Sequence, residues 1–147
     1  MKQYTKFNNI SGWAVFAIAA WVFLSTIEMT GSFWDCGEFI AAAYKLQIGH
    51  PPGAPLFLML SRIMTLFAGS DLQSIPIMVN AFSALMSAFA VLFTFWTITA
   101  IARKIVFVKN QEPTLAQILT VVASGVVGAL AFTFTDSFWF SAVEGEV

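Results

Sequence analysis

The sequence predicts an all-α membrane protein with three transmembrane helices and one or two interfacial helices in the first outer loop. Hydrophobic residues make up 59% of the chain and charged residues only 10%, and few soluble domains could cover so much apolar surface. Three runs are also long and apolar enough to cross a bilayer, which takes about 20 residues of helix. We expect spans at about 12–28, 77–101 and 115–134, and an outer loop at about 29–76.

The net charge and the cysteine count argue against a nucleic-acid-binding protein and against a scaffold held by disulfides. The net charge of −1 offers no concentrated basic surface for nucleic acid. The single cysteine, Cys36, has no partner for an internal disulfide. Because the sequence runs to Val147 without a terminating pattern, we expect the N-terminal part of a longer polytopic membrane domain, inactive on its own.

The first apolar run follows Lys2 and Lys6 and is interpreted as a retained membrane anchor. A cleaved signal peptide has a similar basic start, but its apolar region of about 7–15 residues ends at a small-residue cleavage site. The residues after Leu24 read Ser-Thr-Ile-Glu-Met and contain no such site.

The short apolar stretch 56–68 is predicted to lie along the outer interface. It is too short to cross, and Arg62 would cost about 2.5–3.5 kcal/mol at the centre of a bilayer. With three spans, the basic residues follow the positive-inside tendency and the N-terminus is cytoplasmic. The residues then placed inside are Lys2, Lys6, Arg103, Lys104 and Lys109.

Small and weakly polar residues recur at helical spacing in the second and third runs. Such stripes let helices approach closely and form hydrogen bonds across the contact. They predict packing within this chain or against further transmembrane helices of a longer chain. The stripes comprise Asn80, Ser83, Ser87, Ala90, Thr94 and Thr97 in the second run and Thr120, Ser124 and Gly128 in the third.

Two acids, Asp35 and Glu38, follow the first span and are the candidate catalytic residues. Their spacing also fits a capping box, in which Asp35 caps a helix and Glu38 bonds back to the backbone. Phe33 and Trp34 are aromatic residues of the kind that concentrate at membrane interfaces. Lys45 falls on the same helical face as Glu38, where it either binds an anionic group or extends to the membrane surface.

The only histidine, His50, directly precedes Pro51, Pro52 and Gly53. Two prolines end a helix and push the preceding residue into an extended conformation, so His50 is expected in a stiff corner. Its side chain either bonds to a phosphate or hydroxyl, or makes a structural bond to a backbone carbonyl. Because no second histidine or cysteine stands at ligand spacing, neither a metal nor another cofactor is expected.

The stretch WDCGEFIAAAYKLQIGHPPGAPL, residues 34–56, resembles the opening of the protein O-mannosyltransferase-like membrane proteins. These belong to the GT-C superfamily of glycosyltransferases, which use lipid-linked sugars. The closing stretch TDSFWFSAVEGEV, residues 135–147, resembles a second segment of that family. The better-known O-mannosyltransferases carry adjacent Asp-Glu, whereas Cys36 and Gly37 separate the two acids here.

The resemblance implies transfer of a mannose-like sugar from a polyprenyl-phosphate donor to a Ser/Thr hydroxyl of an acceptor protein outside the membrane. A bacterial inner membrane is expected, with the loop in the periplasm. Asp35 would then be the general base, a role worth about 10²–10⁴-fold, with Glu38 assisting or orienting the acceptor. Substrate-binding candidates are Trp34, Lys45, His50 and Arg62.

The two acids near the end, Glu144 and Glu146, are interpreted as solvated residues, with a place in an acceptor cleft as the alternative. Two other classes of protein compete with an enzyme. A transporter would place acids near the bilayer midplane, where these runs have none. A scaffold or assembly subunit would need only the packing stripes.

The topology predicts the outcome of cysteine-accessibility labelling in intact membranes. Cysteines placed at Gln73 and Asp136 should be labelled from one side, and a cysteine at Lys109 from the other, because stretch 56–68 does not cross. Labelling of positions 73 and 109 from the same side would contradict the three-span arrangement.

Overall fold

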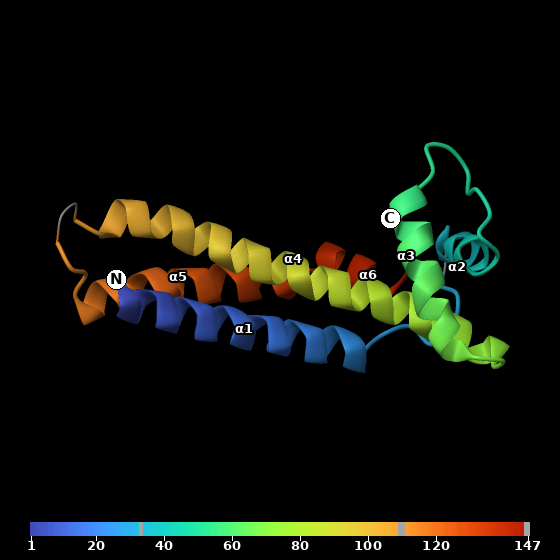
Figure 1. The fold of residues 1–147 in the computed structure, drawn as a ribbon, viewed down its shortest axis with the longest axis horizontal. Helices are drawn as coiled ribbons and strands as arrows, with labels where there is room; N and C mark the ends of the chain where they lie inside the picture. The colour runs from blue at the N-terminus through green and yellow to red at the C-terminus, as the bar shows by residue number, and fades with distance from the viewer. Residues whose placement is uncertain (33, 109–110, 146–147) are drawn as a thin grey trace. The chain divides into compact units, whose positions relative to one another are not determined.

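The computed structural model describes residues 1–32, 34–108 and 111–145. The interpretations that involve Phe33, Lys109 and Glu146 lie outside these residues. Within them, every regular element is a helix. In chain order (Figure 1) the elements are α1 (Lys2–Ser25), α2 (Cys36–Lys45), α3 (Pro55–Thr65), η1 (Leu66–Ala68), η2 (Leu72–Ser74), α4 (Ile75–Val106), α5 (Leu115–Thr133) and α6 (Asp136–Val143).

Three helical stretches are long and apolar enough to cross a membrane, which confirms the predicted fold class. They are Lys2–Ser25, Leu72–Val106 and Leu115–Thr133. The first begins about ten residues before the predicted span. It ends at Ser25, where the hydroxyls of Ser25 and Thr26 donate to the carbonyl of Val22 at 2.8 and 2.9 Å. Those bonds satisfy a carbonyl that the helix end leaves without a backbone partner.

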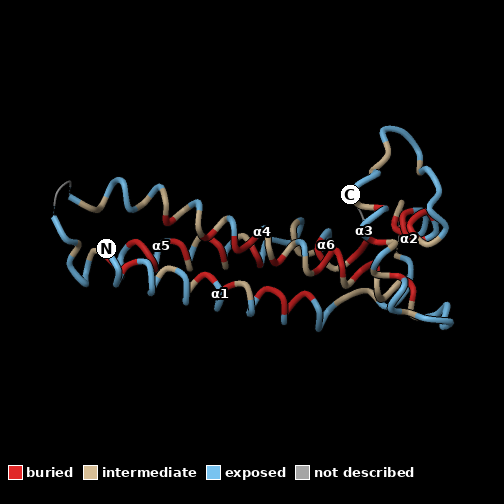
Figure 2. Tube along the Cα trace, in the orientation of Figure 1, coloured by how far each residue is buried: buried red, intermediate tan, exposed pale blue. Residues whose placement is uncertain are grey.

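The helices form two compact units, and α1 and α4 contribute to both. Unit 1 (1–21 and 88–135) is a three-helix bundle of α1, α4 and α5. Glycines allow its close contacts: a Cβ at Gly12 would lie 2.8 Å from the indole nitrogen of Trp96, and one at Gly125 would lie 2.5 Å from Thr99. Figure 2 shows the buried residues along the facing sides of these helices.

Unit 2 (22–87 and 136–147) contains α2, α3, α6, the end of α1 and the start of α4. The rings of Phe39 and Phe57 pack edge to face, with their centroids 5.9 Å apart, and this contact joins α2 to α3. Phe57 also contacts Phe82 of α4 at 5.8 Å. The buried core of this unit consists of Cys36, Phe39, Ile40, Ala42, Ala43, Leu58, Ile75 and Val79.

The helix predicted at 56–68 is formed by α3 and η1, but its polar face points inward. Ser61 and Thr65 are buried, whereas Met59, Ile63 and Phe67 are exposed. The outward face is therefore apolar, as expected for a helix that faces lipid or a further helix.

The predicted packing stripes are correct only in part. On α4, Asn80 and Ser83 are buried, but Ala90 and Thr97 are exposed. On α5 the contacting face is rotated away from Thr120 and Ser124, and its buried residues are Ile118, Val121, Val122, Gly125, Ala129 and Thr133. The hydroxyls of the exposed residues donate to carbonyls of their own helices, as Thr97 does to Phe93 at 2.8 Å, so they need no partner helix.

Among the described residues of unit 2, Asn80 has the side chain with the most hydrogen bonds to other parts of the chain. It is fully buried, and its amide nitrogen donates to the carbonyls of Glu28 and Thr30 at 2.7 and 3.2 Å. Its amide oxygen accepts from the backbone N–H of Gly145 at 2.8 Å and from the Cys36 thiol at 3.9 Å. A single side chain thus holds the loop after α1, the start of α2 and the segment after α6.

Replacing Asn80 with leucine should destabilise the protein by about 2–4 kcal/mol, because two carbonyls and one N–H lose their partner inside the core. Unfolding in a denaturing-detergent titration measures this free energy. The matched control is Thr94→Val on the same helix, whose hydroxyl bonds only to Ala90 of its own helix and should cost less than about 0.5 kcal/mol. Equal costs for the two variants would contradict the role given to Asn80.

Candidate functional site

Asp35, Glu38 and His50 come together on the loop side of α2. Asp35 precedes the helix, Glu38 lies in its first turn, and His50 lies in the segment between α2 and α3. Glu38 Oε2 is 3.1 Å from His50 Nδ1, and Asp35 Oδ2 is 3.7 Å from Nε2. The imidazole therefore stands between the two carboxylates, and all three side chains are about half exposed.

Glu38 fixes His50 by two bonds at once. In addition to the imidazole contact, Glu38 Oε1 accepts the backbone N–H of His50 at 2.7 Å. Gly49 permits this approach, because a Cβ there would lie 3.3 Å from the same oxygen. The turn closes with the N–H of Gly53 donating to the carbonyl of His50 at 2.9 Å. The proline corner therefore holds the histidine against the helix.

These bonds lower the pKa of the Glu38 carboxyl below its usual range. The largest cause is the backbone N–H of His50, followed by the hydrogen bond from its imidazole. Hydrogen bonds to the ionised form favour that form. The lowered pKa therefore keeps Glu38 ionised and bonded to His50 over a wider pH range than that of an ordinary glutamate.

The capping-box interpretation of the two acids is wrong. Asp35 stands at the N-cap position of α2 but makes no side-chain capping bond, and Glu38 bonds to His50 instead of to the start of the helix. The interaction with His50 replaces the bond back to the helix. A capping box occurs instead at the start of α5, between Thr114 and Gln117.

Arg62 is directed to the end of α2. Its guanidinium donates to the carbonyl of Tyr44 at 2.7 Å and lies 5.3 Å from the centre of the Tyr44 ring. A cation at a helix C-terminus satisfies a free carbonyl and interacts favourably with the helix dipole. The structure thus gives Arg62 a structural contact, and it does not bring the side chain to the cluster of Asp35, Glu38 and His50.

The two remaining candidates are exposed. Lys45 lies in the last turn of α2, two turns and about 10 Å of helix beyond Glu38. Trp34, beside Asp35, is 88% exposed and has a positive φ of 61°. A tryptophan in this conformation without burial gains nothing from packing within unit 2, so its ring is available for a membrane or a substrate.

An apolar cavity of about 360 Å³ lies along the segment that carries His50. Its walls are formed by Leu46, Gln47, Ile48, Gly49, Pro52, Gly53, Ala54, Pro55, Leu58 and Met59. Gly49 and Pro52 lie close to His50 in the chain, so the cavity and the cluster share one loop. Its mostly apolar lining suits a hydrocarbon ligand.

The interpretation of Glu144 as a solvated residue is wrong, because Glu144 is buried. It accepts a hydrogen bond from the hydroxyl of Ser32 and, with Glu28 and Phe140, lines a second cavity of about 390 Å³. Glu144 therefore lines a cavity, and a place in an acceptor cleft stays a prediction. The sequence repeats Ser-Phe-Trp at residues 32–34 and 137–139, but three residues are too few to predict this burial.

The cluster also offers a possible set of metal ligands, although none was expected. One ligand atom from each of Asp35, Glu38 and His50 lies within 4.8 Å of the others. Ligand spacing in the sequence did not reveal this set because His50 joins the acids only through the fold of the α2–α3 segment. In the structure, Glu38 Oε2 and the imidazole Nδ1, two of these candidate ligand atoms, are already hydrogen-bonded to each other.

Comparison with known proteins decides the family. A family model described as "Protein O-mannosyl-transferase TMEM260 N-terminal domain" matches residues 35–147 and thus begins at the first acid of the cluster. The chain belongs to this family.

Two curated relatives agree with the assignment. The chain is 31% identical over 135 residues to "Protein O-mannosyl-transferase TMEM260" of Mus musculus, covering 91% of the chain and 16% of the relative. It is 27% identical over 113 residues to the Dictyostelium discoideum protein of the same description, covering 77% and 12%. No solved structure matches.

The chain therefore spans less than a fifth of these relatives. Both are eukaryotic, so the bacterial membrane and the orientation expected from the sequence stay predictions. The family and the spanning-length helices establish a membrane protein.

The Glu38–His50 contact predicts a measurable titration. Carboxyl NMR of the full-length protein should give Glu38 a pKa below that of a model glutamate. The stabilisation of the corner by this pair is then complete above the ordinary glutamate pKa and is lost as the pH falls through the lowered value. His50→Ala keeps the backbone N–H, which is the larger cause, so the pKa should rise only part of the way. An ordinary or raised pKa in the unmodified protein would contradict the geometry.

Proposed function

We propose that the full-length protein is a membrane O-mannosyltransferase whose reaction takes place at the cluster of Asp35, Glu38 and His50. Its donor is a polyprenyl-phosphate sugar, and its acceptor is a Ser/Thr hydroxyl of a protein on the outer side of the membrane. The observation that carries the proposal is the convergence of the three side chains in a chain that belongs to the TMEM260 family.

The reaction is a single displacement at the sugar. The acceptor oxygen attacks the anomeric carbon, the bond from that carbon to the phosphate oxygen breaks, and its electron pair leaves with the lipid phosphate. The hydroxyl proton passes to a carboxylate, since a Ser/Thr hydroxyl is a weak nucleophile until a base accepts that proton. The configuration at the anomeric carbon is inverted.

Asp35 is assigned as the base because its carboxylate makes fewer hydrogen bonds than that of Glu38. Both carboxylate oxygens of Glu38 are bonded to His50: Oε1 to the backbone N–H at 2.7 Å and Oε2 to the imidazole Nδ1 at 3.1 Å. Asp35 makes no capping bond, and its Oδ2 lies 3.7 Å from the imidazole Nε2. Glu38 is a positioning residue, which fixes the ring edge that faces Asp35.

The donor is assigned to the apolar cavity of the same loop. Its residues, among them Leu46, Pro55 and Met59, suit the first isoprene units of a lipid carrier. The phosphate then lies at the polar end of the loop, where His50 offers a hydrogen bond and Lys45, at longer range, supplies positive charge. Because Glu38 and His50 already bond to each other, the proposal uses no divalent metal.

The competing classes receive less support. A scaffold subunit would need the Asn80 contacts and the helix packing but not two half-exposed carboxylates held around a histidine. A transporter would carry ionisable groups within its spans, and the cluster lies outside the three spanning-length stretches.

The decisive variant is Asp35→Asn in the full-length protein. Transfer of mannose from a polyprenyl-phosphate donor to a Ser/Thr peptide should fall by about 10²-fold or more, because the amide cannot accept the proton. Donor binding and thermal stability should be nearly unchanged, since Asp35 makes no capping bond.

Glu38→Gln should have a smaller effect on transfer, because the glutamine oxygen still accepts the His50 N–H. The control is Asp71→Asn, which removes an exposed carboxylate that caps η2 and does not belong to the cluster, and it should leave transfer near normal. Near-normal transfer by Asp35→Asn would move the base to Glu38 or away from this loop.

A further inference from the structure

The second cavity of unit 2, here called the acidic cavity, has a volume of about 390 Å³ and no part in the reaction proposed above. Two segments that are distant in the chain line it, the loop after α1 and the end of α6. The backbone N–H of Glu28 donates to the carbonyl of Val143 at 3.0 Å and joins these segments directly. The residues that line the cavity include Glu28, Thr30, Ser32, Phe140, Val143 and Glu144.

Glu28 offers one carboxylate oxygen to an occupant of the acidic cavity. The residue is half-buried, and its Oε1 accepts from the backbone N–H groups of Met29 and Thr30 at 3.1 and 3.3 Å and from the Thr30 hydroxyl at 3.0 Å. These bonds hold the carboxylate in place. Within the described part of the chain they all go to Oε1, so Oε2 can accept a hydrogen bond from a ligand.

Glu144 adds a second, deeper negative charge to the same cavity. It is only 3% exposed, and the Ser32 hydroxyl donates a hydrogen bond to it. Among residues 1–32, 34–108 and 111–145, no cationic side chain lies within ion-pair distance of it. A buried carboxylate is costly unless a positive charge compensates it, and in a poorly screened interior its charge attracts a cation without direct contact. The two acids therefore indicate a cationic occupant.

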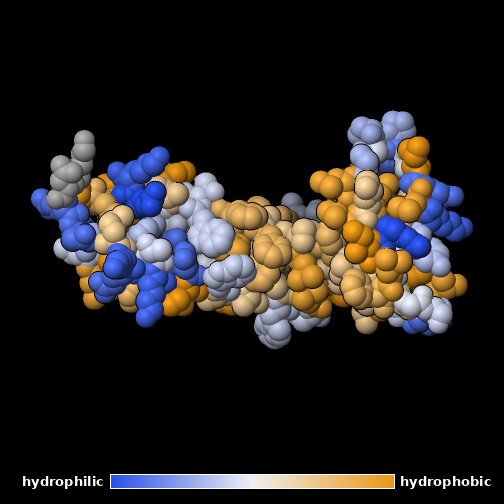
Figure 3. All heavy atoms as spheres, in the orientation of Figure 1, coloured by the Kyte–Doolittle hydropathy of each residue, from blue (hydrophilic) through white to orange (hydrophobic). Residues whose placement is uncertain are grey.

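The acidic cavity and the reaction cluster both follow the same end of α1. On the face shown in Figure 3, mainly hydrophobic residues cover the middle of α1 and α4, and carboxylates are costly within a bilayer. Glu28 comes three residues after the last residue of α1, Ser25. Among the described residues, no spanning-length stretch separates Glu28 from Asp35. An acceptor that reaches Asp35 can therefore reach this cavity from the same side of the membrane.

The chain also limits the distance between the acidic cavity and the proposed base. Ser32, which lines the cavity, comes three residues before Asp35. Three residues of chain extend at most about 11 Å, so the Cα atoms of Ser32 and Asp35 lie within that distance of each other. An extended peptide advances about 3.3 Å per residue. When its hydroxyl stands at Asp35, a side chain two or three residues away can enter the cavity.

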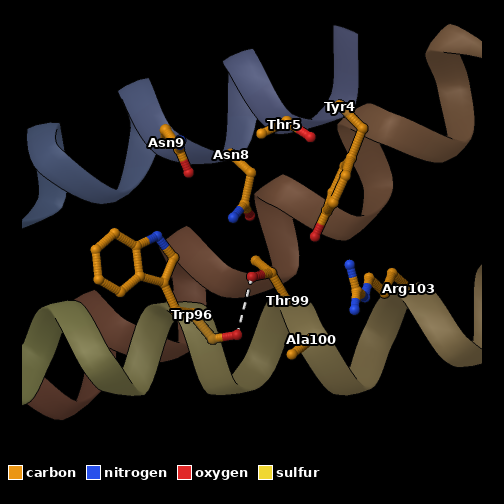
Figure 4. Close-up of a pocket in the computed structure, with 8 residues that line it drawn as sticks. All are labelled: Tyr4, Thr5, Asn8, Asn9, Trp96, Thr99, Ala100 and Arg103. Atoms are coloured by element: carbon orange, nitrogen blue, oxygen red, sulfur yellow. Dashed lines mark hydrogen bonds between the residues drawn. The ribbon is translucent and has the colours of Figure 1, made fainter. Parts of the chain in front are cut away.

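Charge distinguishes the acidic cavity from two other cavities of the protein. Among the described residues that line the polar cavity between α1 and α4 in unit 1, the charged one is Arg103 (Figure 4), which would repel a cation. The residues that line the apolar cavity of the α2–α3 segment include none with a charge. Of these three cavities, the acidic cavity is therefore the one that attracts a positively charged group.

Resting on the proposed function, we propose that the acidic cavity is an acceptor subsite, which binds a lysine or arginine side chain two or three residues from the Ser/Thr that receives the sugar. Glu28 Oε2 accepts a hydrogen bond from the ammonium or guanidinium group, and Glu144 strengthens the attraction from the wall of the cavity. Phe140, which is 67% exposed, covers the methylene groups of the bound side chain. The volume of the cavity is within the range of ligand pockets. Acceptors with a basic residue near the hydroxyl are therefore preferred.

Two threonine peptides test the proposal with the full-length protein. One carries lysine at the positions two and three residues from the threonine, and the other carries norleucine there, which keeps the methylene groups without the charge. Equilibrium binding and kcat/KM for sugar transfer should both favour the lysine peptide by about tenfold, as expected for a hydrogen bond between charged groups. The ratio should fall at high salt, which screens charge.

Glu28→Gln should bring the ratio of the two peptides close to one. The amide oxygen can still accept from the N–H groups of Met29 and Thr30, so the loop should keep its fold. Glu144→Gln, which can still accept from Ser32, should lower the ratio in part. The matched control is Asp71→Asn, which removes an exposed carboxylate that does not line the cavity and should leave the ratio unchanged.

Equal binding of the two peptides by the unmodified protein would overturn the proposal. A ratio that Glu28→Gln and Glu144→Gln leave unchanged would also overturn it, because a purely structural role of the acids affects both peptides equally. The binding measurement separates this proposal from the proposed function. Lysine-dependent binding that requires Glu28, without sugar transfer to either peptide, would support the subsite and contradict the reaction.

Discussion

The arrangement of unit 2 depends on the side-chain amide of Asn80, whose donors and acceptor are all hydrogen-bonded. The side chain of Asn80 donates twice and accepts twice inside a buried core, which is the full hydrogen-bonding capacity of an asparagine. Its partners lie 44 to 65 residues away in the chain. Without Asn80, each of these backbone partners would be a buried polar group without a hydrogen bond, which is costly. The loop after α1 and the segment after α6 are therefore held to the same turn of α4.

The candidate site is built on this anchor by a second, more local constraint. Asn80 accepts from the first residue of α2, Cys36, and so fixes the end of the helix at which Asp35 and Glu38 stand. Glu38 then draws His50 back across the segment between α2 and α3. Burial supplies the first constraint and exposed hydrogen bonds supply the second, so the three side chains of the cluster stay about half exposed.

The sequence predicted the class of the fold better than it predicted the contacts of the candidate site residues. Apolar runs determine the three long helices, whereas the proximity of Asp35, Glu38 and His50 depends on the fold of the segment between α2 and α3. The capping box failed because hydrogen bonds between Glu38 and a residue twelve positions later replaced local ones. The burial of Glu144 and the contacts of Arg62 were missed for the same reason, since periodicity describes one helix and not the neighbour that it meets.

The central claim is that the loop held by Asn80 and Glu38 presents the reacting groups to a lipid-linked sugar. An experimental structure of the full-length protein with a non-transferable polyprenyl-phosphate mannose analogue tests this claim most directly. The account predicts the lipid in the cavity of the α2–α3 segment, the phosphate beside His50 and the anomeric carbon facing Asp35, with room for a hydroxyl between them. A donor bound in another part of the protein, with the cluster of Asp35, Glu38 and His50 away from the sugar, would contradict it.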